Sequence, residues 1–181
     1  VDLPDPLVEF STKFEEQDRY LTRGAADEIA GVVDVDRLAS IAWDVNRIVT
    51  DRAAEIGLTH QDGKIECLYH DGTVKVADVV GTFDENRFHA DGRQVSKEVI
   101  RQYYKRTDPE WVETVEEAKR EAEVEGVADW RTICEMGPKP LPDHVISVVS
   151  NLYAAGANAY TGYDLFDVPD LSAVLERLDD L

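Results

Sequence analysis

Apolar residues recur at helical spacing along the segment from residue 34 to residue 56. Its aliphatic side chains are separated by steps of three and four positions and are Leu38, Ile41, Val45, Ile48 and Val49. This pattern predicts an amphipathic helix, and Gly57 follows at the position where a glycine commonly ends one. Trp43 belongs to the same segment and is expected to lie in the core.

Two strand-like runs follow this helix, at residues 60–69 and 73–80. A turn signal at residues 70–73 separates them, so the pattern predicts an antiparallel hairpin. Alternation along the first strand would place three charged side chains on one face, namely Asp62, Lys64 and Glu66. Residues 81–95 are rich in Asp, Asn and Gly and are predicted to form a loop.

Helices are predicted for most of the remaining chain. Their expected ranges are 96–105 with Ser96 as N-cap, 109–125 with Asp108 as N-cap, a turn or two within 127–136, 144–160 with Asp143 as N-cap, and 171–178. The predicted fold class is α+β, with a small antiparallel sheet, helices packed on one side and a helical C-terminal segment. The expected division is a ligand-binding domain at residues 1–106 and a helical extension packed on it at residues 107–181.

The 181 residues carry a formal net charge of −19. Acidity of this degree repels nucleic acid and anionic membranes, so neither is an expected partner. It also destabilises the compact state unless salt screens the charges, and in molar salt the Debye length is about 3 Å. We therefore hypothesise a salt-rich cytoplasm as the protein's environment. An ordinary acidic mesophilic domain is the alternative.

Cysteine usage and hydropathy place the chain in a reducing, soluble compartment. Cys67 and Cys134 are too few for a disulfide framework and lack the spacing of a zinc site. No run approaches the roughly 20 apolar residues of a membrane span, and no basic-then-apolar leader is present in the sequence. The expected location is the cytoplasm, and the oligomeric state stays open, a homo-oligomer included.

The charges at Asp62, Lys64 and Glu66 suggest a ligand, because charged groups on a half-buried surface need partners. Magnesium prefers carboxylate oxygens, and an ammonium group suits a phosphate, so a magnesium nucleotide would satisfy all three side chains. The alternative is a solvent-facing strand with an internal Lys–Glu pair that contributes little.

Four motifs resemble those of the phosphoribosylaminoimidazole-succinocarboxamide synthases, the SAICAR synthetase family. Residues 57–66 resemble the family's G-L-x-x-x-D-x-K-x-E segment, residues 78–88 its D-E-V-x-T-P-D-S-S-R-F, residues 96–101 its D-K-x-x-F-R, and residues 11–15 with Asp18 its S-T-K-x-E. The matches follow the family's order and cover about residues 3–106. Tyr153 and the Tyr-Thr-Gly at residues 160–162 resemble the family's closing helix.

Some positions depart from the family's pattern. Val79 replaces a glutamate, Phe83 a proline and Ser96 an aspartate, while Cys67 and Leu68 stand where the family has Phe and Gly. The loss of two carboxylates supports an alternative, a noncatalytic nucleotide-binding or scaffold module derived from the family.

The resemblance implies a SAICAR synthetase-like fold related to ATP-grasp, and an ATP-dependent ligase of purine biosynthesis. Such enzymes join L-aspartate to a carboxylated aminoimidazole ribonucleotide and release ADP and phosphate. Carried over by position, Glu66 and Asp78 would bind Mg²⁺, and Lys13, Lys64 and Glu66 would bind ATP. The catalytic group would be Lys64, Glu66 and Asp78, and the ribonucleotide would be held by Asp62, Asp84, Arg87, Lys97 and Arg101.

The resemblance also implies a preceding N-terminal portion with a glycine-rich phosphate loop, without which the ligase would be inactive. It further requires a particular hairpin register. A two-residue Asp71-Gly72 turn would pair Glu66 with Ala77, whereas joint metal binding needs Glu66 to face Asp78. We expect the second register.

Overall fold

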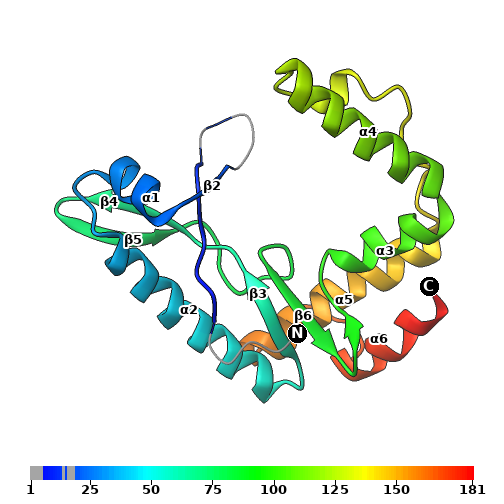
Figure 1. Cartoon of the computed structure of the whole chain (residues 1–181). Helices are drawn as coiled ribbons and strands as arrows, with labels where there is room; N and C mark the ends of the chain where they lie inside the picture. The colour runs from blue at the N-terminus through cyan, green and yellow to red at the C-terminus, as the bar shows by residue number, and fades with distance from the viewer. Residues whose placement is uncertain (1–5, 14, 16–18) are drawn as a thin grey trace.

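The computed structural model describes residues 6–13, 15 and 19–181, so Phe14 and Asp18 of the first motif lie outside the described residues. It combines helices with small antiparallel sheets, which confirms the α+β fold class. Figure 1 shows an open arc, with the β4–β5 hairpin (Glu66–His70 and Thr73–Ala77) at one end and helix α4 (Pro109–Glu125) at the other.

The predicted helix at residues 34–56 is confirmed as α2, Val35–Glu55. Asp34 is its N-cap and accepts a hydrogen bond from the backbone N–H of Asp36 at 2.8 Å. Gly57 follows the C-cap with a φ of 76°, a conformation that glycine adopts without strain. A preceding helix, α1 (Arg23–Ala30), was not predicted and is capped by Thr22.

The prediction of one strand over residues 60–69 is wrong. The segment divides into β3 (Thr59–Gly63) and β4, and each half pairs with a different partner. The first half pairs with β6 (Asn86–Ala90), which continues into β7 (Arg93–Gln94), where a loop was predicted. Asp62 and Glu66 therefore belong to different sheets, and the shared strand face predicted for Asp62, Lys64 and Glu66 is not formed.

The expected hairpin register is also wrong, because β4 and β5 pair Glu66 with Ala77. Asp71 and Gly72 both have positive φ angles, 49° and 75°, as a two-residue type I′ turn requires. A two-residue turn of this type imposes the register in which Glu66 pairs with Ala77. Asp78 comes one residue after β5 and has a φ of 64°, so strand alternation ends before it.

The C-terminal helices form largely where predicted. They are α3 (Glu98–Thr107), α4, the 3-10 turn η1 (Trp130–Thr132), α5 (Asp143–Thr161), α6 (Leu171–Arg177) and the 3-10 turn η2 (Leu178–Asp180). Three predicted caps differ in detail. Lys97 rather than Ser96 is the N-cap of α3, and Pro142 rather than Asp143 is that of α5. Asp108 is the N-cap residue of α4, but its side chain caps no N–H of the helix.

The core joins α2 and the β3–β6 sheet to α5 and α6. Phe88 of β6 and Leu152 of α5 are fully buried at its centre. The division into two parts at residue 106 stays a prediction. Trp43 was predicted to belong to this core but is 53% exposed. Its indole N–H donates to the Pro6 carbonyl at 3.3 Å, so it lies under the N-terminal segment, on a side of α2 away from the main core. No described helix is long and apolar enough to cross a membrane.

Candidate functional site

A β-bulge in strand β3 brings Asp62 opposite Arg87. His60 pairs with Phe88 and Asp62 pairs with Arg87, so Gln61 is the extra residue. The Arg87 guanidinium donates twice to the Asp62 carboxylate, from Nε to Oδ1 and from Nη2 to Oδ2, each at 2.7 Å. This hydrogen bonding raises the pKa of Arg87. Two predicted substrate residues therefore form one planar, two-pronged contact.

Asp84 lies in the loop that precedes β6 and contacts the C-terminal part of the chain. The Tyr153 hydroxyl on α5 donates to Asp84 Oδ1 at 2.8 Å. Burial raises the pKa of Tyr153, and the hydrogen bond to Asp84 acts in the same direction, so the phenol stays protonated as a donor. The sequence suggested Tyr153 only as a family echo, and the structure shows its partner.

Phe83 anchors the same loop, although the family pattern has a proline there. Its ring meets the Tyr153 ring edge-on, with centroids 5.6 Å apart. It also packs directly against Gly156 of α5, where a Cβ atom would approach Phe83 Cε2 to 2.5 Å. A buried aromatic side chain therefore fixes the loop that carries Asp84.

Helix α3 contributes the two remaining predicted cations. The Lys97 backbone N–H donates to the Phe83 carbonyl at 3.2 Å, which places the start of α3 against the Asp84 loop. Arg101 forms an ion pair with Glu98, a carboxylate only 9% exposed. Glu98 also acts electrostatically on Arg87 and raises its pKa, so the carboxylate lies in the neighbourhood of both arginines. The sequence analysis did not identify Glu98 as a site residue.

A second group of predicted residues lies at the base of the β4–β5 hairpin. Lys13, just after strand β1 (Phe10–Ser11), forms an ion pair with Glu66, the half-buried first residue of β4. The Asp78 carboxylate accepts from the Val79 backbone N–H at 2.8 Å. Lys64 connects the two groups, because its backbone N–H donates to the Glu85 carbonyl at 3.1 Å.

These positions constrain how a metal ion could bind. Within the described part of the chain, no cluster of three or more His, Cys, Asp or Glu side chains is arranged to hold one. Magnesium commonly uses one or two carboxylates and takes its other ligands from phosphates and water. Glu66 and Asp78 are carboxylates at the same end of the hairpin, and carboxylates are suitable donors for such a site. Glu66 pairs with Ala77 rather than Asp78, but strand alternation ends before Asp78, so their joint use stays a prediction.

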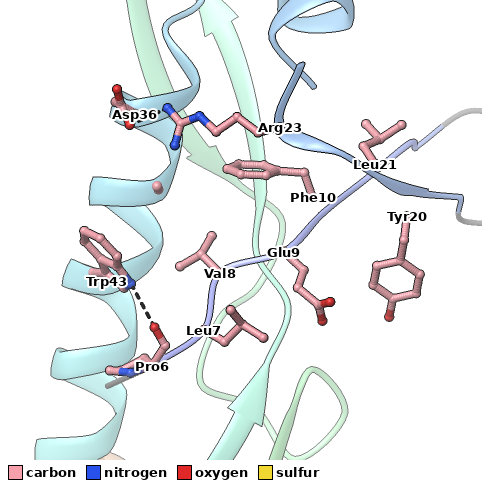
Figure 2. Close-up of a pocket in the computed structure, with 11 residues that line it drawn as sticks. Pro6, Leu7, Val8, Glu9, Phe10, Tyr20, Leu21, Arg23, Asp36 and Trp43 are labelled. Carbon is pink, nitrogen blue, oxygen red and sulfur yellow. Dashed lines mark hydrogen bonds and ion pairs between the residues drawn. The ribbon is translucent and has the colours of Figure 1, made fainter. Parts of the chain in front are cut away.

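The hollow shown in Figure 2 is separate from these charged groups. It has a volume of about 480 Å³ and lies between residues 6–10, strand β2 (Tyr20–Leu21) and helix α2. Trp43 and Phe10 contribute aromatic walls, and the Arg23–Asp36 ion pair closes one end. None of the predicted site residues is among those that line it.

The chain is similar to known proteins of one family. A family model described as SAICAR synthetase matches residues 1–118. A putative phosphoribosylaminoimidazole-succinocarboxamide synthase from Archaeoglobus fulgidus is 42% identical over 182 residues, covering 99% of this chain and 52% of that protein. The synthase from Thermoplasma acidophilum is 31% identical over 170 residues, covering 88% of this chain and 54% of that protein.

A solved structure is also similar. It is a SAICAR synthetase (Type-2) in complex with ADP, with a TM-score of 0.50 and 28% sequence identity, and the match covers 55% of this chain and 45% of that one. The chain spans about half the length of the two curated relatives, those from Archaeoglobus fulgidus and Thermoplasma acidophilum.

Proposed function

This chain belongs to the SAICAR synthetase family, and we propose that it forms the substrate-binding part of an ATP-dependent ligase of purine biosynthesis. The reaction would join L-aspartate to a carboxylated aminoimidazole ribonucleotide and release ADP and phosphate. The observation that carries the proposal is the 42% identity over 99% of the chain. That match includes both the charged motifs and α5, which supplies Tyr153 to Asp84.

The group around Arg87 would bind the ribonucleotide. Arginine offers a planar fork that suits phosphate, and both Arg87 and Arg101 are under the electrostatic influence of Glu98. Each guanidinium is held by a carboxylate, so its orientation is set before the substrate arrives. Asp62 and Asp84 would then accept hydrogen bonds from substrate hydroxyl or amino groups, and Lys97 would add a further positive charge.

The group at the hairpin base would bind the nucleotide. Lys13 and Lys64 would contact ATP phosphates, and Glu66 and Asp78 would hold Mg²⁺. When bound, the metal would neutralise phosphate charge during phosphoryl transfer. In the present structure Lys13 is paired with Glu66, so both side chains would exchange partners when the nucleotide enters.

Amide formation needs the substrate carboxylate to be activated, because oxide is a poor leaving group. The carboxylate oxygen would attack the γ-phosphorus of ATP and release ADP, and the aspartate amine would then displace phosphate from the acyl phosphate. The role of this chain's residues would be to hold two anions side by side, which requires cations placed in advance. Lys64 would supply one of these cations, because it stands in the chain between Asp62 of the first group and Glu66 of the second.

The wider setting follows from the same proposal. The partners would be small molecules rather than nucleic acid or membrane. The enzyme would work in a salt-rich cytoplasm, and a homo-oligomer is compatible with the proposal. Residues 1–106 would form the ATP- and substrate-binding domain, and residues 107–181 the helical extension. Activity would need a preceding portion that carries the phosphate loop.

Calorimetric titration with Mg-ATP would test the proposal, using the chain alone and joined to the N-terminal portion of the Archaeoglobus fulgidus relative. The joined form should bind Mg-ATP and release ADP only when ribonucleotide and L-aspartate are both present. Lys64→Met should abolish this turnover, whereas Lys75→Met, on the exposed β5 strand, should not. Failure of both forms to bind Mg-ATP would favour a noncatalytic module.

A further inference from the structure

His60 lies on the inner face of the β3–β6 sheet, beside the candidate substrate residues. It pairs with the fully buried Phe88, and their ring centroids are 5.3 Å apart. The bulge at Gln61 turns Asp62 to the outer face while His60 stays inside. His60 therefore lies on the face of the sheet opposite to Asp62 and Arg87, where it can influence their position without contacting the substrate.

Asn86 is the polar partner of His60 and is only 5% exposed. The Gly81 backbone N–H donates to Asn86 Oδ1 at 2.9 Å, and Asn86 Nδ2 lies 2.8 Å from His60 Nε2. A backbone N–H can only donate, so the amide oxygen must face Gly81 and the amide nitrogen must face the ring. His60 Nε2 also lies 3.1 Å from the Asp62 carbonyl, which can only accept, and we assign the hydrogen bond to the shorter contact with Asn86. With Nε2 as acceptor, the ring proton is on Nδ1, which donates to Thr50 Oγ1 at 2.9 Å.

Gly63 makes room for this arrangement. It pairs with Asn86 across the sheet, and a Cβ atom at Gly63 would lie 2.0 Å from Asn86 Nδ2. Its φ lies outside the left-handed region, so the backbone would accept alanine and only the Asn86 side chain excludes it. Gly63 and Asn86 form a matched pair.

The same contacts fix both ends of the loop at residues 81–86, which carries Asp84. Asn86 ends the loop, directly precedes Arg87 and holds Gly81 at the loop's start. Its backbone N–H also donates to the Thr82 carbonyl at 2.9 Å. Through Thr50 and His60, the loop that carries Asp84 is tied to α2.

We propose that His60 and Asn86 are a positioning pair that sets the geometry of Asp84 and Arg87 for the imidazole ribonucleotide, with Gly63 as the residue that admits Asn86. The proposal rests on the ligase function proposed above. Neither side chain touches the substrate in this scheme, and each acts through the loop.

The pair is sensitive to protonation. The Asp62 carbonyl lies 3.1 Å from His60 Nε2, and a protonated Nε2 would donate to it and turn an N–H toward the Asn86 amide. One nitrogen cannot serve both partners, so protonation releases Asn86. Burial lowers the pKa of His60, against a smaller opposing effect of the Asp62 backbone and carboxylate. The ring's other contacts, Thr50, Asn86 and Phe88, are neutral. Ribonucleotide affinity should therefore decline on acidification.

Nitrogen-15 NMR of the chain's histidines tests the pairing without any assay of activity. We expect neutral His60 to carry its proton on Nδ1, with His70 at the exposed hairpin end as an internal reference. In Asn86→Asp a carboxylate oxygen would face Nε2, so the ring should hold a second proton to higher pH than in the unsubstituted chain. A proton on Nε2 of the neutral ring, or an unchanged titration in Asn86→Asp, would overturn the pairing.

Kinetics of the joined enzyme test the positioning role. Gly63→Ala should lower the Tm and raise the KM for the ribonucleotide at least tenfold, with the KM for ATP unchanged. Gly63→Ala combined with Asn86→Ser should recover the part of the Tm loss that the clash causes, so that its Tm matches that of Asn86→Ser alone, but it should not recover the KM. A normal ribonucleotide KM in the double variant would reduce Asn86 to a space-filling role and overturn the proposal.

A matched control is His70→Asn, which should alter neither KM nor Tm. Absence of ligase activity in the unsubstituted joined protein would instead contradict the proposed function. It would remove the substrate role of the pair but leave the NMR result on the pairing intact.

Discussion

Replacing Arg87 should damage ribonucleotide binding far more than stability. The Arg87 and Asp62 side chains are 49% and 52% exposed, so their ion pair is largely solvated. Exposed pairs contribute up to about 1 kcal/mol, and the two-pronged geometry puts this pair near that limit. For a protein of this size, a loss of about 1 kcal/mol lowers the Tm by roughly 2–4 °C.

The expected effect on binding is larger. A hydrogen bond to a charged group contributes about 1.5–3 kcal/mol, which corresponds to a factor of roughly 10–150 in affinity. Arg87→Ala should therefore raise the KM for the ribonucleotide by one to two orders of magnitude, and the KM for ATP should stay the same. Arg87→Lys keeps the charge but loses the fork, so its effect should be intermediate.

Steady-state kinetics of the joined enzyme and thermal unfolding of the chain measure the two effects separately. Arg47→Ala is the matched control, because Arg47 is an exposed arginine of α2 with long ion pairs of 3.9 and 3.8 Å. A normal ribonucleotide KM in Arg87→Ala would refute the assignment of Arg87 to the substrate. A Tm loss well beyond 4 °C would show that the pair is mainly structural.

Four further predictions concern Glu66, Tyr153, Asp108 and the net charge of the chain. Glu66→Gln should abolish ATP turnover in the joined enzyme, and a near-normal rate would remove Glu66 from the metal site. Tyr153→Phe removes the donor to Asp84, so the ribonucleotide KM should rise about fivefold, the equivalent of about 1 kcal/mol, and an unchanged KM would count against this contact. Hydrogen bonding from Lys139 lowers the pKa of Asp108. The resulting stabilisation of the folded state is complete above the unfolded carboxylate's pKa of about 3.9 and is lost as pH falls through the lower folded pKa. Asp108→Asn should therefore flatten the acid side of a curve of stability against pH. Thermal stability should rise with KCl concentration, and equal stability in dilute buffer and molar salt would contradict the salt-rich setting.

Local signals in the sequence were sufficient for most of the helices and for one turn, although helix α1 was missed. The repeat of apolar residues and the cap at Asp34 predict α2, because helical hydrogen bonds join residues only four apart. Asp71 and Gly72 determine the hairpin turn and its register by an equally local effect, because the turn depends on the φ angles of these two neighbouring residues. We had expected the role of Glu66 and Asp78 in the family to override that effect. The charged motifs also indicated the family, because they stand in the family's order along the chain whatever the fold does locally.

Strand partners and burial were decided only by the tertiary structure. Nothing local indicates that β3 leaves the hairpin to pair with β6, which joins segments about 25 residues apart and buries Phe88 against α5. The same pairing creates the bulge at Gln61 and thereby aligns Asp62 with Arg87. A strand's partner is chosen by the burial of distant apolar side chains, and this long-range term is not written in any short stretch of sequence.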